Sequence, residues 1–154
     1  MSNHTAIVRW KSSGSNFLKG QYSREHTWTF DGGLSVPASP SPSIVPAPWS
    51  NAANVDPEEA FVAAVSSCHM LFYLMFAYKN GFQVDSYEDE AVGTMTKNER
   101  GLLWLSSIQL NPRVVYGGEK RPTAEDEERL HHLSHEQCFI ANSIKSDVTV
   151  GRKR

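Results

Sequence analysis

The stretch Pro57–Tyr78, PEEAFVAAVSSCHMLFYLMFAY, is the longest strongly apolar run in the chain. At helical period, apolar side chains and one cysteine recur along one face, which comprises Phe61, Ala64, Val65, Cys68, Leu71, Phe72, Met75 and Phe76. The other side is also mostly apolar, with Val62, Met70, Tyr73 and Leu74. A helix that is apolar nearly all round is typical of a buried position. The stretch therefore predicts a central core helix with the Cys68 thiol halfway along it.

Signals at both ends of this stretch support a helix. Asp56 can cap the free N–H groups, and Pro57 suits the first helical position. Asn80-Gly81 is a stop signal. The run is long enough for a membrane span, but acidic residues precede it, Lys79 ends it, and Ser66–His69 interrupts it with polar groups. We therefore expect a core helix and no membrane association.

Length and charge limit the class of protein. We expect the 154 residues to form one domain, 1–154, with a core of its own. A formal net charge of −2 gives no reason to expect nucleic-acid binding, and the basic end 151–154 is typical of a frayed tail. No charged segment followed by an apolar run begins the chain, which predicts a soluble cytoplasmic protein.

Strands and a proline-rich loop precede the central helix. Thr5–Trp10 and Gln21–Phe30 alternate polar and apolar residues and predict a hairpin, and Asp31-Gly32 predicts a turn into a short strand around Leu34. Residues 36–49 contain five prolines and predict an extended surface loop. This loop brings Trp49 to the start of the helix.

A second strand-rich region and a second helix follow. The predicted strands are Ser86–Lys97, Gly101–Leu110, Arg113–Tyr116 and, at the end, Asp147–Val150, with the first two forming an antiparallel hairpin. The segment 123–145 predicts a long helix that contains Cys138 and begins at a capping box between Thr123 and Asp126. This order of elements predicts an α+β fold with antiparallel sheets and two long helices, the central one buried.

The two cysteines, Cys68 and Cys138, leave several readings open. They do not make a disulfide framework, and they could be buried packing, a metal pair or a redox pair. Buried packing is how free cysteines usually behave. Redox chemistry would need a thiolate on one cysteine, a cation beside it, and a second thiol to trap the oxidised sulfur.

The motif DPEEAFVAAVSSC, with a cysteine ten residues after Glu58, resembles the OsmC/Ohr family of thiol peroxidases. That family carries a similar Asn-Pro-Glu-x-Leu-x-Ala-Ala…Ala-Cys helix, and Cys138 in CFIANSIKSDVTV matches its second cysteine. The resemblance covers most of the chain and implies the fold of that family. The proline-rich loop and the Ser-Ser-Cys-His-Met run are features of a divergent branch.

Four residues acquire roles from this resemblance. Cys68 resembles the peroxidatic cysteine and Cys138 the resolving one. Glu58 matches the glutamate at the helix start, and Arg24 resembles the arginine that precedes a similar turn in the hydroperoxide-resistance branch. The chain has Phe139 directly after the second cysteine, where the family often has proline, and this difference could alter the exposure of Cys138.

The resemblance implies a cysteine-based organic hydroperoxide reductase without a bound cofactor or metal. Arg24 would stabilise the Cys68 thiolate, held by Glu58 in a bidentate pair. Cys138 would resolve the Cys68 sulfenic acid as a disulfide, which an external dithiol such as a lipoyl group would reduce. The apolar side chains of Trp49, Met70 and Phe72 suit an organic peroxide as substrate.

The resemblance also implies an intertwined homodimer with sites at its interface. Ten residues of helix span about 15 Å, so Glu58 cannot touch Cys68 of its own helix. Either Arg24 bridges the two residues, or Glu58 comes from a partner subunit. A helix that is apolar all round fits a dimer, because a small domain has little else to bury it against.

Other roles remain open for several of these residues. Arg24 could be a solvated strand arginine, Glu58 an acid that serves only the helix dipole, and His69 a core or interface histidine. An OsmC-fold protein without peroxidase turnover could instead bind a hydrophobic small molecule in the same pocket. The remaining alternative is a metal site on the predicted second helix, formed by His131, His132, His135 and Cys138.

Overall fold

The computed structural model describes residues 1–14 and 16–151. The chain forms two compact units, Met1–Ala60 and Phe61–Arg154. Of the predicted basic tail, residues 152–154 lie outside the described residues.

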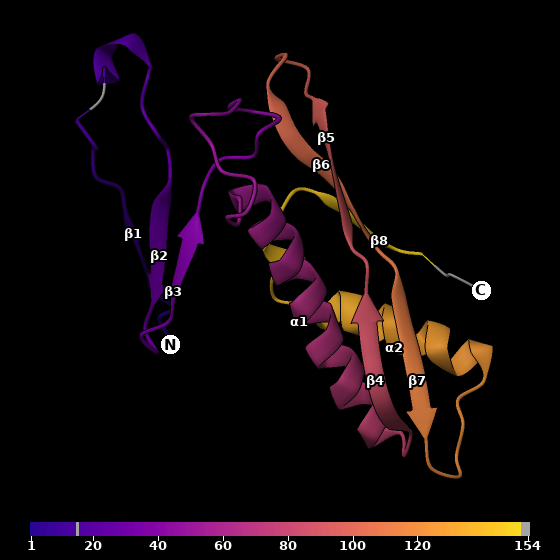
Figure 1. The fold of residues 1–154 in the computed structure, drawn as a ribbon. Coiled ribbons are helices and arrows are strands. Elements are labelled where there is room, and N and C mark those ends of the chain that lie inside the picture. Colours follow the sequence, from indigo (N-terminus) through magenta and orange to yellow (C-terminus); the bar gives the residue numbers. More distant parts are fainter. Residues whose placement is uncertain (15, 152–154) are drawn as a thin grey trace. The chain divides into compact units, whose positions relative to one another are not determined.

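The first unit contains a three-stranded antiparallel sheet in the order β1 (Ala6–Arg9), β2 (His26–Phe30) and β3 (Ser35–Ala38), visible in Figure 1. The predicted hairpin is therefore confirmed. The predicted strand from residue 21 to residue 30 is too long, because only its second half pairs. Before His26, the Arg24 N–H leaves the sheet and donates to the Trp49 carbonyl at 3.0 Å.

The proline-rich segment is a loop after its first residues, which still belong to β3. Buried Ser39 fixes its course. The Ser39 hydroxyl accepts a hydrogen bond from the Asn51 N–H at 2.8 Å, and the Ser39 N–H donates to the Val55 carbonyl at 3.0 Å. A short 3-10 helix, η1 (Phe17–Lys19), lies in the loop between β1 and β2.

The central helix, α1 (Pro57–Lys79), begins and ends where the sequence predicts. The Glu59 N–H donates to the Asp56 carboxylate at 2.7 Å, and the Asp56 N–H donates to the Glu59 carboxylate at 3.2 Å. These reciprocal bonds satisfy N–H groups that lack a partner within the helix. Gly81 follows the helix with φ of 77°, a conformation that favours glycine.

Burial of α1 within the single chain is confined to one stripe, which differs from the expectation of a helix buried nearly all round. The buried residues are spaced four apart: Val65, His69, Tyr73 and Ala77. On the other side Leu71 is 60% exposed. By length and composition alone α1 could cross a membrane, but the core helix of a soluble protein passes the same test. One chain does not supply enough neighbours to cover this helix.

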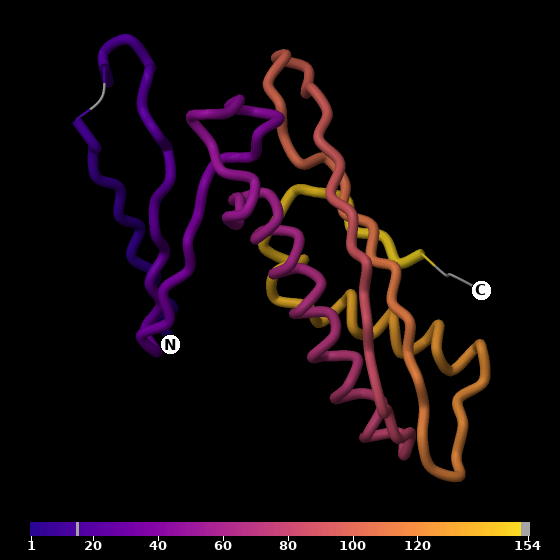
Figure 2. The backbone as a smooth tube through the Cα atoms, in the orientation of Figure 1, coloured from indigo at the N-terminus to yellow at the C-terminus, as the bar shows by residue number. Residues whose placement is uncertain are grey.

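Two sheets follow in the second unit. In one, β4 (Gln83–Asp89) pairs antiparallel with β7 (Pro112–Gly117). In the other, β6 (Leu103–Leu110) pairs antiparallel with β5 (Val92–Lys97) and parallel with β8 (Asp147–Val150). The predicted β5–β6 hairpin is confirmed, whereas the parallel β6–β8 pair differs from the all-antiparallel expectation. Figures 1 and 2 show the two strand pairs following one another along the second unit.

The predicted strand from Ser86 to Lys97 is interrupted after Asp89, which ends β4. The Asp89 carboxylate accepts hydrogen bonds from the Ser66 hydroxyl of α1 at 2.5 Å and from the Asn111 N–H at 2.6 Å. The Asn111 amide donates to the Glu90 carbonyl at 2.9 Å. These bonds fix the break and attach it to α1.

The second helix, α2 (Ala124–Gln137), starts at the predicted capping box. The Asp126 N–H donates to the Thr123 hydroxyl at 3.1 Å, and the Thr123 N–H donates to the Asp126 carboxylate at 3.0 Å. The prediction that the helix continues to residue 145 is wrong, because the backbone turns extended at Cys138. A 3-10 helix, η2 (Ala141–Ser143), follows the turn. Cys138 is therefore the C-cap of α2 rather than a residue inside the helix.

Two apolar clusters form the core of the second unit. The first packs α1 against α2 and the β4–β7 pair and consists of Tyr73, Ala77, Phe82 and Leu130. The second packs the first half of α1 against β6 and consists of Val65, Ile108 and Leu110. Both clusters include residues of the buried stripe of α1. Cys68 lies between their α1 members, Val65 and Tyr73, along the helix.

Candidate active site around Cys68

Cys68 lies at an apolar pocket of about 260 Å³ along α1. Its lining consists, among the described residues, of Cys68, Leu71, Phe72, Met75 and Phe139. Leu71, Phe72 and Met75 follow Cys68 by three, four and seven positions, which places their side chains on the same face of the helix. The thiol is thus the one polar side chain in an otherwise apolar lining.

Two predicted substrate-binding residues, Met70 and Trp49, are not among these lining residues. Met70 is not among the described lining residues, because two positions along a helix turn its side chain to roughly the opposite side from Cys68. Met75 lines the pocket instead. Trp49 belongs to the first unit, where its carbonyl accepts the Arg24 N–H. Phe72 lies in the pocket as expected.

The structure brings the second cysteine to the first. Cys138 is fully buried, and its sulfur accepts a hydrogen bond from the Ala141 N–H at 3.3 Å. Burial, together with a hydrogen bond to the Cys68 side chain, raises the pKa of Cys138 to about 11. Both cysteines are free thiols. Two thiols seventy positions apart in the sequence therefore lie close enough for Cys68 to affect the ionisation of Cys138.

Side chains of Asn142 and Ser143 donate hydrogen bonds to backbone carbonyls around Cys138. The Asn142 amide donates to the carbonyls of Glu136 at 2.8 Å and Cys138 at 3.0 Å. The Ser143 hydroxyl donates to the Phe139 carbonyl at 2.7 Å. These bonds satisfy carbonyls at the end of α2 and fix the turn that carries Phe139 into the pocket lining.

Arg24 is held by its own loop. Its guanidinium donates to the carbonyls of Tyr22 at 2.9 Å and Gly20 at 3.4 Å, and lies 4.0 Å from the centre of the Tyr22 ring. The next residue, Glu25, accepts hydrogen bonds from Asn51 at 2.8 Å and from Asn54 at 3.2 Å. Arg24 and Cys68 belong to different units, so the predicted stabilisation of the thiolate by Arg24 stays a prediction.

Glu58 stands in the first turn of α1, where its charge favours the positive end of the helix dipole. Within residues 1–14 and 16–151 of the single chain it forms no ion pair, so its bidentate pair with Arg24, within one subunit or across two, stays a prediction. Arg24 donates instead to backbone carbonyls of its own loop. The role of Glu58 in orienting a guanidinium stays a prediction.

Sequence reasoning missed a hydrogen bond between buried His69 and half-buried His131. The ring nitrogens Nε2 of His69 and Nδ1 of His131 share a hydrogen bond of 3.0 Å between α1 and α2. His131 also stacks on Tyr73 at 4.3 Å, and the Tyr73 hydroxyl is hydrogen-bonded to that of Tyr116. Burial is the main cause that lowers the pKa of His69 to about 4, so this ring is neutral at pH 7. The pair is a structural link between the two helices.

The family model for OsmC-like proteins matches residues 50–152, two thirds of the chain, including α1, α2 and both cysteines. The chain belongs to the OsmC-like protein family. A comparison with curated proteins finds no match.

Solved structures extend the similarity over the whole OsmC-like chain. An OsmC-like protein of unknown function from Vibrio cholerae is 51% identical, with a TM-score of 0.97, and the match covers 99% of this chain and 100% of that one. An organic hydroperoxide resistance protein from Elizabethkingia anophelis has 17% identity and a TM-score of 0.71, with coverage of 99% and 98%. The organic hydroperoxide resistance protein OhrB of Bacillus subtilis has 19% identity and a TM-score of 0.67, with the same coverage. The α+β fold predicted from the resemblance is confirmed.

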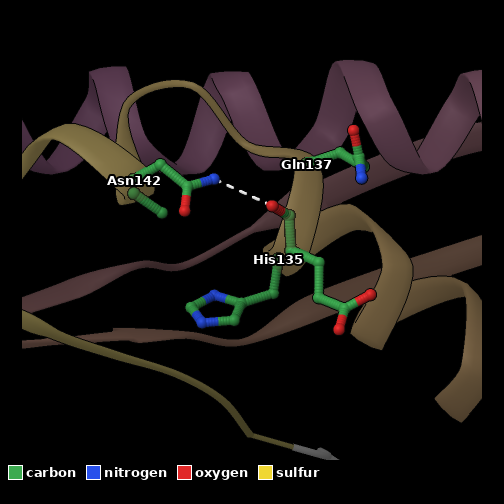
Figure 3. A pocket seen from close by; sticks show the side chains of 5 residues that line it. His135, Gln137 and Asn142 are labelled. Carbon is green, nitrogen blue, oxygen red and sulfur yellow. Dashed lines mark hydrogen bonds between the residues drawn. The ribbon is translucent and has the colours of Figure 1, made fainter.

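A second, polar hollow of about 520 Å³ in the OsmC-like chain lies at the end of α2. Figure 3 shows His135, Gln137 and Asn142 around it, with the bond from Asn142 to the Glu136 carbonyl dashed. The alternative of a metal site here is not supported. No group of three His, Cys, Asp or Glu residues in the described part of the chain could hold a metal ion. His132 Nε2 instead lies 3.3 Å from the Glu136 carboxylate, and His131 bonds to His69.

Proposed function

We propose that this OsmC-like protein is a thiol-dependent peroxidase that reduces organic hydroperoxides to alcohols through Cys68 and Cys138. The observation that carries the proposal is the apolar pocket at Cys68, whose thiol lies close enough to buried Cys138 to affect the ionisation of that second thiol. An apolar lining favours the organic group of a hydroperoxide, and a thiol beside it can receive the peroxide oxygen.

The first step oxidises Cys68. Its thiolate sulfur attacks the terminal oxygen of the hydroperoxide, a sulfur–oxygen bond forms and the oxygen–oxygen bond breaks. The alkoxide leaves, takes up a proton and departs as an alcohol, and Cys68 becomes a sulfenic acid. Cys138 does not compete for the peroxide, because it is fully buried and its raised pKa keeps it protonated.

The second step joins the two cysteines. The Cys138 sulfur attacks the sulfenic sulfur of Cys68, a disulfide forms, and the hydroxyl group leaves as water with the proton of Cys138. An external dithiol, such as a lipoyl group, then reduces the disulfide and is itself oxidised. The proximity of the two side chains supports this step, because reacting groups that are already close lose less freedom on reaction.

We further propose that Arg24 stabilises the Cys68 thiolate, with Glu58 as its carboxylate partner and Trp49 at the substrate. Arg24 is permanently charged and its loop is fixed by Glu25, so it is suited to a catalytic position. A homodimer would supply these groups from one subunit or the other. A cytoplasmic location fits two free thiols that need a dithiol reductant.

A count of free thiols tests the proposal. One equivalent of cumene hydroperoxide should remove both thiols of the wild type, and in Cys138→Ser it should remove one and leave a sulfenic acid that dimedone traps. Cys68→Ser is the matched control and should keep its Cys138 thiol. Two wild-type thiols that survive the peroxide would exclude the peroxidase, and a bound apolar dye would then favour a small-molecule binding protein.

A further inference from the structure

We propose that Phe139 is a specificity-determining residue that favours compact aromatic hydroperoxides over long unbranched ones. This inference rests on the proposed peroxidase function. It concerns the one lining residue of the Cys68 pocket, among those the structure describes, that does not come from α1.

The position of Phe139 makes it the far wall of the pocket. Its ring meets the Phe72 ring edge to face, with 5.1 Å between the centres and 80° between the planes. Cys68, Leu71 and Met75 line the pocket from the helix side. A substrate whose peroxide reaches the Cys68 sulfur therefore places its organic group between α1 and the ring of Phe139.

The backbone that carries this wall is fixed by hydrogen bonds. The carbonyl of Phe139 accepts from the Ser143 hydroxyl at 2.7 Å. The carbonyl of Cys138 accepts from both the backbone N–H and the side-chain amide of Asn142, each at 3.0 Å. Cys138, the residue directly before Phe139, is fully buried and anchors the chain at this point. The backbone that presents the Phe139 ring to the pocket is therefore held in place.

The dimensions and chemistry of the pocket favour a single ring. Its volume of about 260 Å³ lies just below the roughly 300–1,000 Å³ of sites for drug-sized ligands. Phe72 and Phe139 already pair edge to face, and a substrate ring can extend this arrangement with either of them. A long alkyl chain gains no such contact between rings.

Substitutions of Phe139 test the inference on the enzyme. Because the side chain is 72% exposed, its removal leaves both core clusters intact. Phe139→Ala should lower the ratio of kcat/KM for cumene hydroperoxide to that for linoleic acid hydroperoxide by about tenfold, and Phe139→Leu by roughly threefold. Phe30→Leu, at an exposed phenylalanine of β2, is the matched control and should not change the ratio. An unchanged ratio in Phe139→Ala would overturn the inference.

A second measurement separates this inference from the peroxidase proposal. In the Cys138→Ser background the rates of Cys68 alkylation by N-benzylmaleimide and N-octylmaleimide are compared, which needs no peroxide. The benzyl preference, which is the ratio of the N-benzylmaleimide rate to the N-octylmaleimide rate, should fall by about tenfold in Phe139→Ala, as for the hydroperoxides. A wild type that alkylates selectively but consumes no hydroperoxide would end the peroxidase proposal alone. A benzyl preference that Phe139→Ala leaves unchanged would end the role of Phe139.

Discussion

At the scale of the residue, His69 couples folding to pH. Its pKa is lowered from 6.5 to about 4, first by burial and then by His135, against a smaller opposing effect of Asp89. The unfolded chain therefore binds a proton between these values that the folded chain does not bind. Stability should fall as the pH drops from 6.5 towards 4, by up to roughly 3 kcal/mol.

Urea unfolding of the wild type and of His69→Gln between about pH 7.5 and about pH 5 measures this effect. The mutant should show a flatter dependence of the free energy of unfolding on pH. Exposed His132, paired with Glu136, supplies the control variant His132→Gln, which should keep the wild-type slope. The carboxyl pKa values of Glu25 and Asp126 are lowered from ordinary values of 4.5 and 3.8. Protonation of these two groups therefore affects stability only at a lower pH than that of His69. Equal slopes in wild type and His69→Gln would contradict the assignment.

The residues around Cys68 and His69 show which side-chain positions the sequence predicts and which it does not. Helical spacing put Leu71, Phe72 and Met75 on the face of Cys68, and these residues do line the pocket. Met70 was predicted to bind substrate because it is an apolar residue near Cys68 in the sequence, although two positions along the helix turn it away. The partner of His69 is 62 positions distant, and no local pattern could indicate it.

At the scale of the element, the starts of both helices were predictable and the end of α2 was not. Capping residues lie within three positions of each start, as at Asp56 and Thr123. The end of α2 depends on the Asn142 amide, which reaches back to the Glu136 and Cys138 carbonyls from beyond the turn. Glycine and proline, the usual stop signals, are absent from residues 124–145 of the sequence.

The strand break at Asp89 yields a prediction for the second unit. Asp89→Ala removes the acceptor for both the Ser66 hydroxyl and the Asn111 N–H, which are partly buried. The free energy of unfolding should fall by about 1–3 kcal/mol, because a partly buried N–H is left without a partner. Urea titration measures the change.

The matched control for Asp89 is Glu88, its neighbour in β4. Glu88 forms an exposed ion pair with Arg113 at 2.7 Å, and exposed pairs contribute at most about 1 kcal/mol. Glu88→Ala should therefore cost less than Asp89→Ala. Equal losses in the two variants would mean that Asp89 does not hold the strand break to α1.

At the scale of the whole molecule, the predicted order of elements was correct, while the pairing of distant strands was not. The last strand was located to the residue, from Asp147 to Val150. Its parallel pairing with β6 depends on the path of the chain through α2 and η2, which alternation of polar and apolar residues does not encode. The family resemblance supplied the fold where local patterns could not.

The apolar surface left on α1 leads to the last prediction, a homodimer. Only 22% of the most apolar window of α1 is buried, and Leu71 and Tyr78, seven positions apart on one face, are 60% and 67% exposed. Soluble proteins rarely leave such a face open to water, and a second copy of the chain would cover it. Sedimentation velocity should therefore give a dimer at micromolar concentration. Tyr78→Glu should shift the equilibrium towards the monomer, whereas Leu102→Glu, at the tip of the β5–β6 turn, should not. A wild-type monomer that binds lipid vesicles would instead assign this face to a membrane surface.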